Sequence, residues 1–134
     1  MDNKVVSIDG PAGAGKSTVA KQLSERINFT YIDSGALFRA ITLKIIRKGI
    51  EIDNVKSIIF YANNSCIDFI NNNIYLDGVD VSIEIRDNLV SSKVSYIAKI
   101  PEIREIIVNI QRRIALNKNV VVDGRDIGTT VFPQ

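Results

Sequence analysis

Histidine and tryptophan are missing from this 134-residue chain, which also has a single cysteine and only three prolines. Without histidine, the chain lacks the commonest general base and metal ligand of enzymes. With Cys66 as the sole cysteine, no intramolecular disulfide can form, and because Cys66 lies in an apolar run we expect it to be a small core residue. Any catalysis by this chain must therefore work without an imidazole, and its fold must be stable without an intramolecular disulfide.

Neither sign of charge dominates, since 17 basic residues stand against 15 acidic ones. This balance provides no broad field for nucleic acid or an anionic membrane, so neither is expected as a partner. No apolar stretch is long enough to cross a bilayer, and because the first strand-like run begins so early we expect no signal peptide. We therefore expect a cytoplasmic, single-domain protein with no obligate protein partner.

Strand-like and helix-like patterns alternate along the chain and predict an α/β fold. Buried parallel strands are expected at 5–8, 29–32 and 119–123. Helices are predicted for 34–48, 54–63, 87–98 and 101–116, and Gly49 is expected to end the first of them. Two short apolar runs flank Asn71, Asn72 and Asn73, which indicates a small antiparallel hairpin between residues 66 and 76.

A complete phosphate loop, G-x-x-x-x-G-K-S, lies between the first strand-like run and a helix-like run. With the residue that follows it, the loop consists of Gly10, Pro11, Ala12, Gly13, Ala14, Gly15, Lys16, Ser17 and Thr18. Glycines let backbone amides approach a phosphate closely, and the free amides at the start of the next helix add partial positive charge. Lys16 is expected to reach the β- and γ-phosphates, and Ser17 to bind Mg²⁺. The loop predicts a user of nucleoside triphosphate.

Two further segments follow predicted strands and carry residues suited to anions or metals. Ser34 can cap the helix after the second strand, and Arg39 lies a little over one turn further along it, where a guanidinium can bind phosphate. Asp123 ends an apolar strand, a place where phosphate-loop enzymes keep the carboxylate that organises Mg²⁺, and Arg125 and Asp126 follow. Considered singly, the segments also fit an ordinary capped helix and an Asp-Gly turn. Together they predict a donor triphosphate and an acceptor monophosphate at neighbouring strand ends.

Along its whole length the chain resembles the cytidylate kinase family of nucleoside monophosphate kinases. The resemblance is carried by Ile8-Asp9-Gly10-Pro11, Asp33-Ser34-Gly35-Ala36, Asp77-Gly78-Val79-Asp80-Val81 with Ile85-Arg86, Pro101 with Arg104-Glu105 and Gln111-Arg112, and Asp123-Gly124-Arg125-Asp126-Ile127-Gly128-Thr129 with Val131-Phe132-Pro133. It implies phosphorylation of CMP and dCMP by ATP with Mg²⁺. It also implies a P-loop kinase domain over residues 1–134, with an enlarged monophosphate-binding insertion at about 35–100.

The resemblance implies a role for several side chains, position by position. Those matched to the acceptor phosphate are Ser34, Arg39 and Arg125, and those matched to the cytosine ring are Ser95, Arg104 and Asp126. The cations expected to be catalytic are Lys16, Arg39 and Arg125, and the expected Mg²⁺ contacts are Ser17 and Asp123. Considered alone, Ser95 and Arg104 are better explained by a solvated helix face, and only the resemblance favours a role in cytosine binding. Phe38 stands where the family commonly has tyrosine, so a contact made by that hydroxyl is in doubt.

The resemblance stops at Gln134, where family members continue through further strands and an arginine-rich lid for roughly another third of their length. Arginines in such roles are worth about 10³ to 10⁵ in rate, so the chain by itself is expected to be weakly active or inactive. The alternative is a non-catalytic fragment that binds a nucleotide or phosphate. A GTP-binding switch is disfavoured, because Asn117-Lys118-Asn119-Val120 lacks the aspartate of a guanine-recognition motif.

Overall fold

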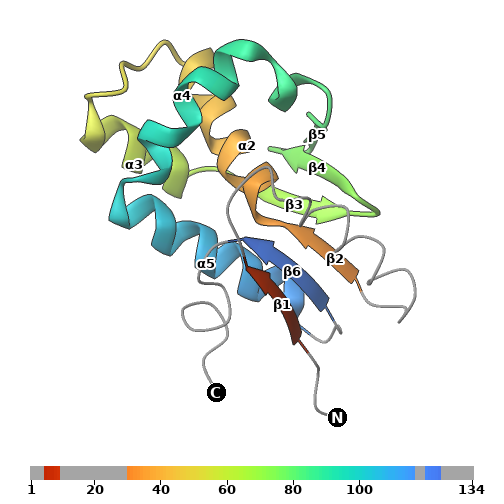
Figure 1. Ribbon diagram of the computed structural model, residues 1–134. Helices are drawn as coiled ribbons and strands as arrows, with labels where there is room; N and C mark the ends of the chain where they lie inside the picture. The colour runs from red at the N-terminus through yellow and green to blue at the C-terminus, as the bar shows by residue number, and fades with distance from the viewer. Residues whose placement is uncertain (1–4, 10–29, 117–119, 125–134) are drawn as a thin grey trace. The chain divides into compact units, whose positions relative to one another are not determined.

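A computed structural model of the chain describes residues 5–9, 30–116 and 120–124, with side chains from Ile32 to Leu116. The chain divides into two units, one formed by residues 1–34 with 108–134 and the other by residues 35–107. The described residues form both helices and strands, which confirms the expected α/β class (Figure 1). The phosphate loop at 10–18 and the helix expected after it lie outside the described residues.

The first unit holds a parallel sheet of three strands, β1 (Val5–Asp9), β2 (Thr30–Asp33) and β6 (Val120–Gly124). Its order is β1-β6-β2, as Figure 1 shows. The register pairs Asp9 with Gly124 and Asp33 with Asp123, so the three strands end together at one edge. The three predicted parallel strands are confirmed, with ends that differ by one residue.

Helix α2 (Ser34–Arg47) follows β2 without an intervening loop. Its buried side chains include Leu37, Ile41 and Ile45, which recur at four-residue intervals and form an apolar stripe. Gly49 ends the helix with a φ of +69°, and the next amide donates a hydrogen bond to the carbonyl of Ile45 at 3.1 Å. The predicted helix and its glycine stop are therefore confirmed.

Helix α3 (Val55–Asn63) begins after Asn54, whose side-chain oxygen accepts a hydrogen bond from the Ser57 amide at 3.3 Å. An antiparallel sheet follows, formed by β3 (Ile67–Ile70), β4 (Asn73–Leu76) and β5 (Val79–Asp80) in that order. The two residues between β3 and β4 are Asn71 and Asn72, with φ of 53° and 67°. A two-residue turn with both φ values positive is favoured in hairpins, so the predicted hairpin is confirmed.

Cys66 is exposed, so the expectation that it is a core residue is wrong. It directly precedes β3, in which Ile67 and Phe69 are buried and Ile70 is exposed. Because side chains alternate along a strand, Cys66 falls on the side of Asp68 and Ile70. Its Sγ lies 3.8 Å from Asp68 Oδ2 on that outward side.

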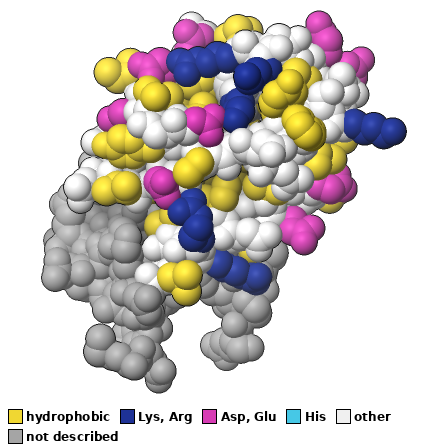
Figure 2. Space-filling view, turned by 180° about the vertical axis from the view of Figure 1, so that it is seen from behind, with side chains coloured by type: hydrophobic (Ala, Val, Ile, Leu, Met, Phe, Trp, Pro, Cys, Tyr) yellow, Lys and Arg dark blue, Asp and Glu magenta, His cyan; other side chains and the backbone are white. Residues whose placement is uncertain are grey.

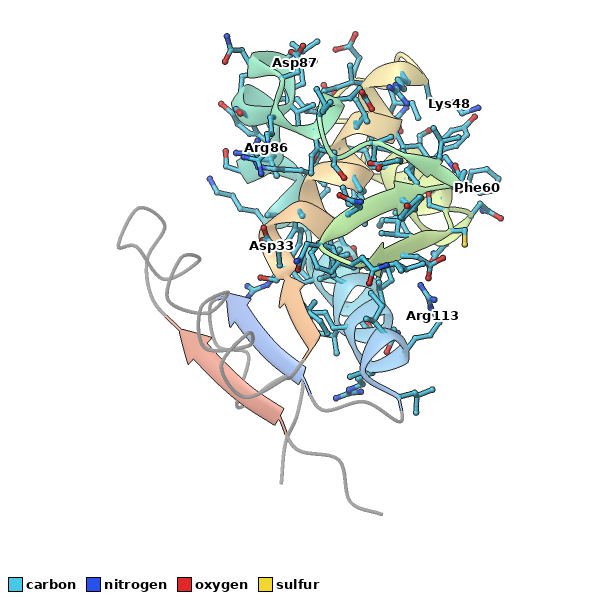
Figure 3. All side chains as sticks on the ribbon, turned by 90° about the vertical axis from the view of Figure 1, so that its right-hand side faces the viewer. Asp33, Lys48, Phe60, Arg86, Asp87 and Arg113 are labelled. Atoms are coloured by element: carbon cyan, nitrogen blue, oxygen red, sulfur yellow. The ribbon has the colours of Figure 1, made fainter. Side chains whose placement is uncertain are left out.

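A short 3₁₀ helix, η1 (Glu84–Arg86), leads into helix α4 (Asn88–Ala98). Asp87 caps α4, because its Oδ1 accepts a hydrogen bond from the Leu89 amide at 2.8 Å. Figure 3 shows Arg86 and Asp87 at this junction. Helix α5 (Pro101–Ala115) begins at the predicted proline, and its buried isoleucines recur at helical spacing: Ile103, Ile107, Ile110 and Ile114.

Acidic and basic side chains of the described residues are interspersed on the face that Figure 2 shows. No area of that face carries one sign of charge alone, which agrees with the balanced composition. Within the part of the chain that the structure describes, no helix is both long enough and apolar enough to span a membrane.

Candidate functional site

The carboxyl ends of β1, β6 and β2 lie side by side in that order, and a segment singled out in the sequence begins after each of them. The expectation that the donor and acceptor segments follow neighbouring strands is wrong, because β6 pairs with both β1 and β2 and lies between them. β1 ends at Asp9, β2 at Asp33 and β6 at Gly124. The residues that come next are Gly10, Ser34 and Arg125. In open parallel sheets, ligands bind at this edge because the loops that leave it converge there. The strand register therefore starts all three predicted ligand segments from one edge.

Several predicted site residues lie outside the described residues, namely 10–18, Arg125 and Asp126. Their roles toward ATP, the acceptor phosphate and cytosine stay predictions. For Asp123 the structure gives the backbone, which pairs with Asp33 one residue before the end of β6. A carboxylate at this position and the hydroxyl of Ser17 are oxygen ligands, the kind that Mg²⁺ prefers. Among the described residues, no group of three acidic, cysteine or histidine side chains could hold a metal ion.

Ser34 is the first residue of α2 and only 6% exposed. Asp33 precedes it and so occupies the position before the helix. The first turn of a helix has free amides and a partial positive charge, which favours a bound anion. The structure therefore places Ser34 at a helix start, and its predicted contact to the acceptor phosphate stays a prediction.

Arg39 lies a little over one turn further along α2 and is half-buried. Its Nη1 donates hydrogen bonds to the Ile85 carbonyl at 3.0 Å and to Ser91 Oγ at 2.9 Å. Both acceptors are uncharged, so neither offsets the positive charge of the guanidinium. Lys44 on the same helix forms a salt bridge with Asp77, whereas Arg39 has no carboxylate partner within the described ranges.

Ser95 and Arg104 lie on α4 and α5 respectively, and both are exposed. Neither side chain makes a hydrogen bond within the described part of the chain. Phe38 precedes Arg39 on α2 and is half-buried. Ser95 and Arg104 are accessible to solvent or to a ligand, and their predicted contacts to cytosine stay predictions.

A charged cluster that the sequence did not suggest ties α2 to the antiparallel sheet. Lys44 Nζ lies 2.7 Å from Asp77 Oδ2 and donates a second hydrogen bond to the Asn64 carbonyl at 3.3 Å. Asp77 Oδ1 accepts a hydrogen bond from the Cys66 amide at 2.8 Å. Burial acts to raise the pKa of Asp77, but the hydrogen bonds from Cys66 and Lys44 outweigh it and hold that pKa below its ordinary value. The Asp77-Gly78 dipeptide was the available signal, since it is a preferred hairpin turn.

Gln111 of α5 is a buried polar residue for which the sequence suggested no separate role. Its side chain is fully buried, and neither its Oε1 nor its Nε2 has a hydrogen-bond partner among the described residues. Helical spacing explains the burial, because Gln111 falls on the same stripe as Ile107 and Ile114. Buried amides are normally hydrogen-bonded, which makes Gln111 an unusual core residue.

Comparison with known proteins shows which family this chain is similar to. The family model described as "Cytidylate kinase" matches residues 6–134. The cytidylate kinase of Alkaliphilus oremlandii (strain OhILAs) is 56% identical over 134 residues, which is 100% of this chain and 62% of that protein. The cytidylate kinase of Clostridioides difficile (strain 630) is 51% identical with the same coverage.

A third relative, the cytidylate kinase of Caldanaerobacter subterraneus subsp. tengcongensis, is 56% identical over 129 residues. That alignment covers 96% of this chain and 58% of the relative. The chain therefore spans less than two thirds of the length of the curated relatives it matches.

Proposed function

We propose that the complete protein transfers the γ-phosphoryl group of ATP to the phosphate of CMP or dCMP. The reason is that this chain belongs to the cytidylate kinase family. The strand register is the structural observation that carries the proposal. Asp9 lies opposite Gly124 and Asp33 opposite Asp123, so the segments expected to hold donor, acceptor and metal leave the same sheet edge. Two phosphorylated ligands gripped at one edge are what phosphoryl transfer requires.

The proposed reaction is a direct in-line transfer that needs no protein nucleophile. Lys16 neutralises the β- and γ-phosphates, while Arg39 and Arg125 orient the acceptor phosphate. When bound by Ser17 and Asp123, Mg²⁺ would supply further neutralisation of the developing charge. The acceptor phosphate has a second pKa of about 6 and is already an anion near neutral pH. A chain without histidine can therefore perform this chemistry.

Cytosine recognition is assigned to Ser95, Arg104 and Asp126. The ring offers an amino donor beside acceptors, so a carboxylate and a hydroxyl can accept from the amine while a guanidinium donates to the ring. Uracil presents an oxygen where cytosine has the amine, which leaves the carboxylate facing another acceptor. Unpaired polar groups of this kind are how a site rejects a close analogue. The exposure of Ser95 and Arg104 supports their access to the ligand.

A steady-state assay of the complete gene product with ATP and CMP tests the proposal. We expect one CDP for each ADP, with turnover of about 1 to 100 s⁻¹. Arg39→Ala should lower kcat/KM for CMP by about tenfold to a hundredfold, because charge-assisted hydrogen bonds to the acceptor phosphate are lost. Arg47→Ala is the matched control, since Arg47 is an exposed arginine of the same helix.

ATP consumption that does not depend on CMP, or equal kcat/KM in the Arg39→Ala variant and the unmodified protein, would contradict the proposal. The 134-residue chain assayed in parallel tests the expectation of low activity for the chain by itself. Nucleotide binding by calorimetry, without turnover in either protein, would favour the alternative of a non-catalytic nucleotide-binding fragment.

A further inference from the structure

The guanidinium of Arg39 is held by two groups that lie far from it in the sequence. We infer that Ser91 and the backbone carbonyl of Ile85 are the positioning groups that aim Arg39 at the phosphate of the acceptor nucleotide. This inference rests on the proposed function, in which Arg39 binds that phosphate. Its direct observations are the hydrogen bonds from Nη1, at 3.0 Å to Ile85 O and 2.9 Å to Ser91 Oγ.

The hydrogen-bond geometry leaves one side of the guanidinium for a ligand. A guanidinium has five N–H donors, and Nη1 carries two of them. Both Nη1 donors are used, by the Ile85 carbonyl and by the Ser91 hydroxyl. The donors that remain belong to Nε and Nη2, which form a side-by-side fork suited to two phosphate oxygens. Within the described residues, no hydrogen bond occupies that fork.

The charge on Arg39 is also kept for a ligand. Its two partners are neutral oxygens, whereas Lys44 on the same helix meets a carboxylate, Asp77, at 2.7 Å. A carboxylate beside Arg39 would compete with a phosphate for the same donors. Neutral acceptors fix the side chain without that competition, so they combine orientation with full positive charge.

Each acceptor belongs to an element that is itself fixed. Ile85 has a buried side chain, and its amide donates a hydrogen bond to the Val81 carbonyl at 3.0 Å. Carbonyls at the end of a short helix lack a partner within that helix, so the Ile85 carbonyl is available to Arg39. Ser91 lies in the first turn of α4, which is capped by Asp87. The two oxygens are therefore held at defined positions before any ligand binds.

Removal of the Ser91 hydroxyl should free the Arg39 side chain while the helix remains. A mobile arginine must then be ordered at the moment of binding, which lowers affinity. For Ser91→Ala we expect the dissociation constant for CMP to rise about threefold to tenfold, as for one lost hydrogen bond to a charged group. The dissociation constant for ATP should stay unchanged, because Arg39 is assigned to the acceptor.

The experiment is calorimetric titration of the complete protein with CMP and, separately, with ATP, together with steady-state kinetics. Ser92→Ala is the matched control, because Ser92 is the next residue of the same helix and its hydroxyl donates to the Leu89 carbonyl instead. Ser91→Thr keeps an oxygen at the same carbon and should restore CMP affinity. Ser91→Ala should raise KM for CMP more than it lowers kcat, and Ser92→Ala should leave both unchanged.

Arg39→Ala separates this inference from the function on which it rests. If Arg39→Ala leaves CMP affinity unchanged, the proposed role of Arg39 fails and the inference fails with it. If Arg39→Ala weakens CMP binding but Ser91→Ala does not, the positioning role of Ser91 is wrong while the proposed function stands. A loss of CMP and ATP affinity together in Ser91→Ala, with no rescue by Ser91→Thr, would assign Ser91 a general structural role and overturn the inference.

Discussion

Arg39 and Lys44 are two cations on one helix, yet they meet different kinds of partner. Lys44 forms an ion pair with Asp77 at 2.7 Å, whereas Arg39 donates to the neutral oxygens of Ile85 and Ser91. The first arrangement satisfies the charge within the protein and ties α2 to the antiparallel sheet. The second keeps the charge available to an anion. Of these two cations on one helix, Lys44 therefore has a structural role and Arg39 a proposed binding role.

The Lys44–Asp77 pair predicts a pH dependence of stability. The pKa of Asp77 in the folded protein lies below its ordinary value of 3.8. A depressed pKa stabilises the fold at pH above the ordinary value, and that contribution is lost as the pH falls through the lowered value. Because the Asp77 side chain is 44% exposed, solvent screens the pair and its contribution should stay below about 1 kcal/mol.

Asp77→Asn should therefore lower the free energy of unfolding at pH 7 by up to about 1 kcal/mol, and the difference should vanish at pH values below the lowered pKa. Urea unfolding at a series of pH values measures both effects. Glu51→Gln is the control, since Glu51 is an exposed carboxylate outside the cluster. A difference between Asp77→Asn and the unmodified protein that is the same at pH 7 and at acidic pH would contradict this account.

Candidate site residues could be chosen from the sequence only where the signal is local. Ser34 and Arg39 could be chosen because they share one predicted helix after one predicted strand. The groups that hold Arg39 could not, because Ile85 and Ser91 lie 46 and 52 residues away along the chain. The exposure of Cys66 could not be predicted for a related reason, since an apolar run does not show which side of a strand faces inward.

At the scale of elements, long patterns were predicted well and short ones were missed. α2, α4 and α5 show helical spacing with clear start or stop residues, and the structure confirms them. β5 has only two residues and η1 only three, which is too short for any periodicity. The Asp77-Gly78 turn was the available indication of β5, with φ of 51° and 84°.

The end of α2 gives a prediction about backbone strain. Gly49 has a φ of +69°, and a Cβ added there would meet no atom within 4 Å. Gly49→Ala should thus be destabilising through the backbone alone, by about 1 to 2 kcal/mol, and Gly49→Asn should be milder because asparagine tolerates this conformation. Thermal unfolding should give the highest melting temperature for the unmodified protein, a lower one for Gly49→Asn and the lowest for Gly49→Ala.

Gly35→Ala serves as the control for Gly49→Ala, because Gly35 is an exposed residue inside α2 and its φ is not positive. Alanine is favoured over glycine in helices, so this variant should be neutral or slightly stabilised. Equal melting temperatures for Gly49→Ala and the unmodified protein would contradict the role of Gly49 as a helix stop.

On the scale of the whole molecule, burial in the unit of residues 35–107 should decide stability. Ile103 of α5 is 0% exposed, whereas Ile83, before η1, is 82% exposed. Ile103→Ala should lower the free energy of unfolding by about 2 to 5 kcal/mol, because it removes buried apolar groups and leaves a cavity. Ile83→Ala should change it by less than about 0.5 kcal/mol. Denaturant unfolding compares the two, and similar values for both would contradict the burial described above.

Topology was the part of the fold that local patterns could not predict. The strands at 5–9, 30–33 and 120–124 were each expected, but their order, with β6 between β1 and β2, depends on long-range pairing. Hydrophobic periodicity indicates that a strand is buried and not which strand lies beside it. The pairing matters for function, because it brings Asp33 opposite Asp123 and so joins two predicted ligand segments.

We propose that the donor and acceptor phosphates bind together at the carboxyl edge of the parallel sheet. A crystal structure of the complete protein with CMP and a non-hydrolysable ATP analogue tests it most directly. We expect the CMP phosphate at about 2.7 to 2.9 Å from Nε and Nη2 of Arg39. Nη1 should still donate to Ile85 O and Ser91 Oγ, and the triphosphate should lie in the loop of Lys16. A CMP phosphate bound away from Arg39, or a triphosphate away from Lys16, would contradict it.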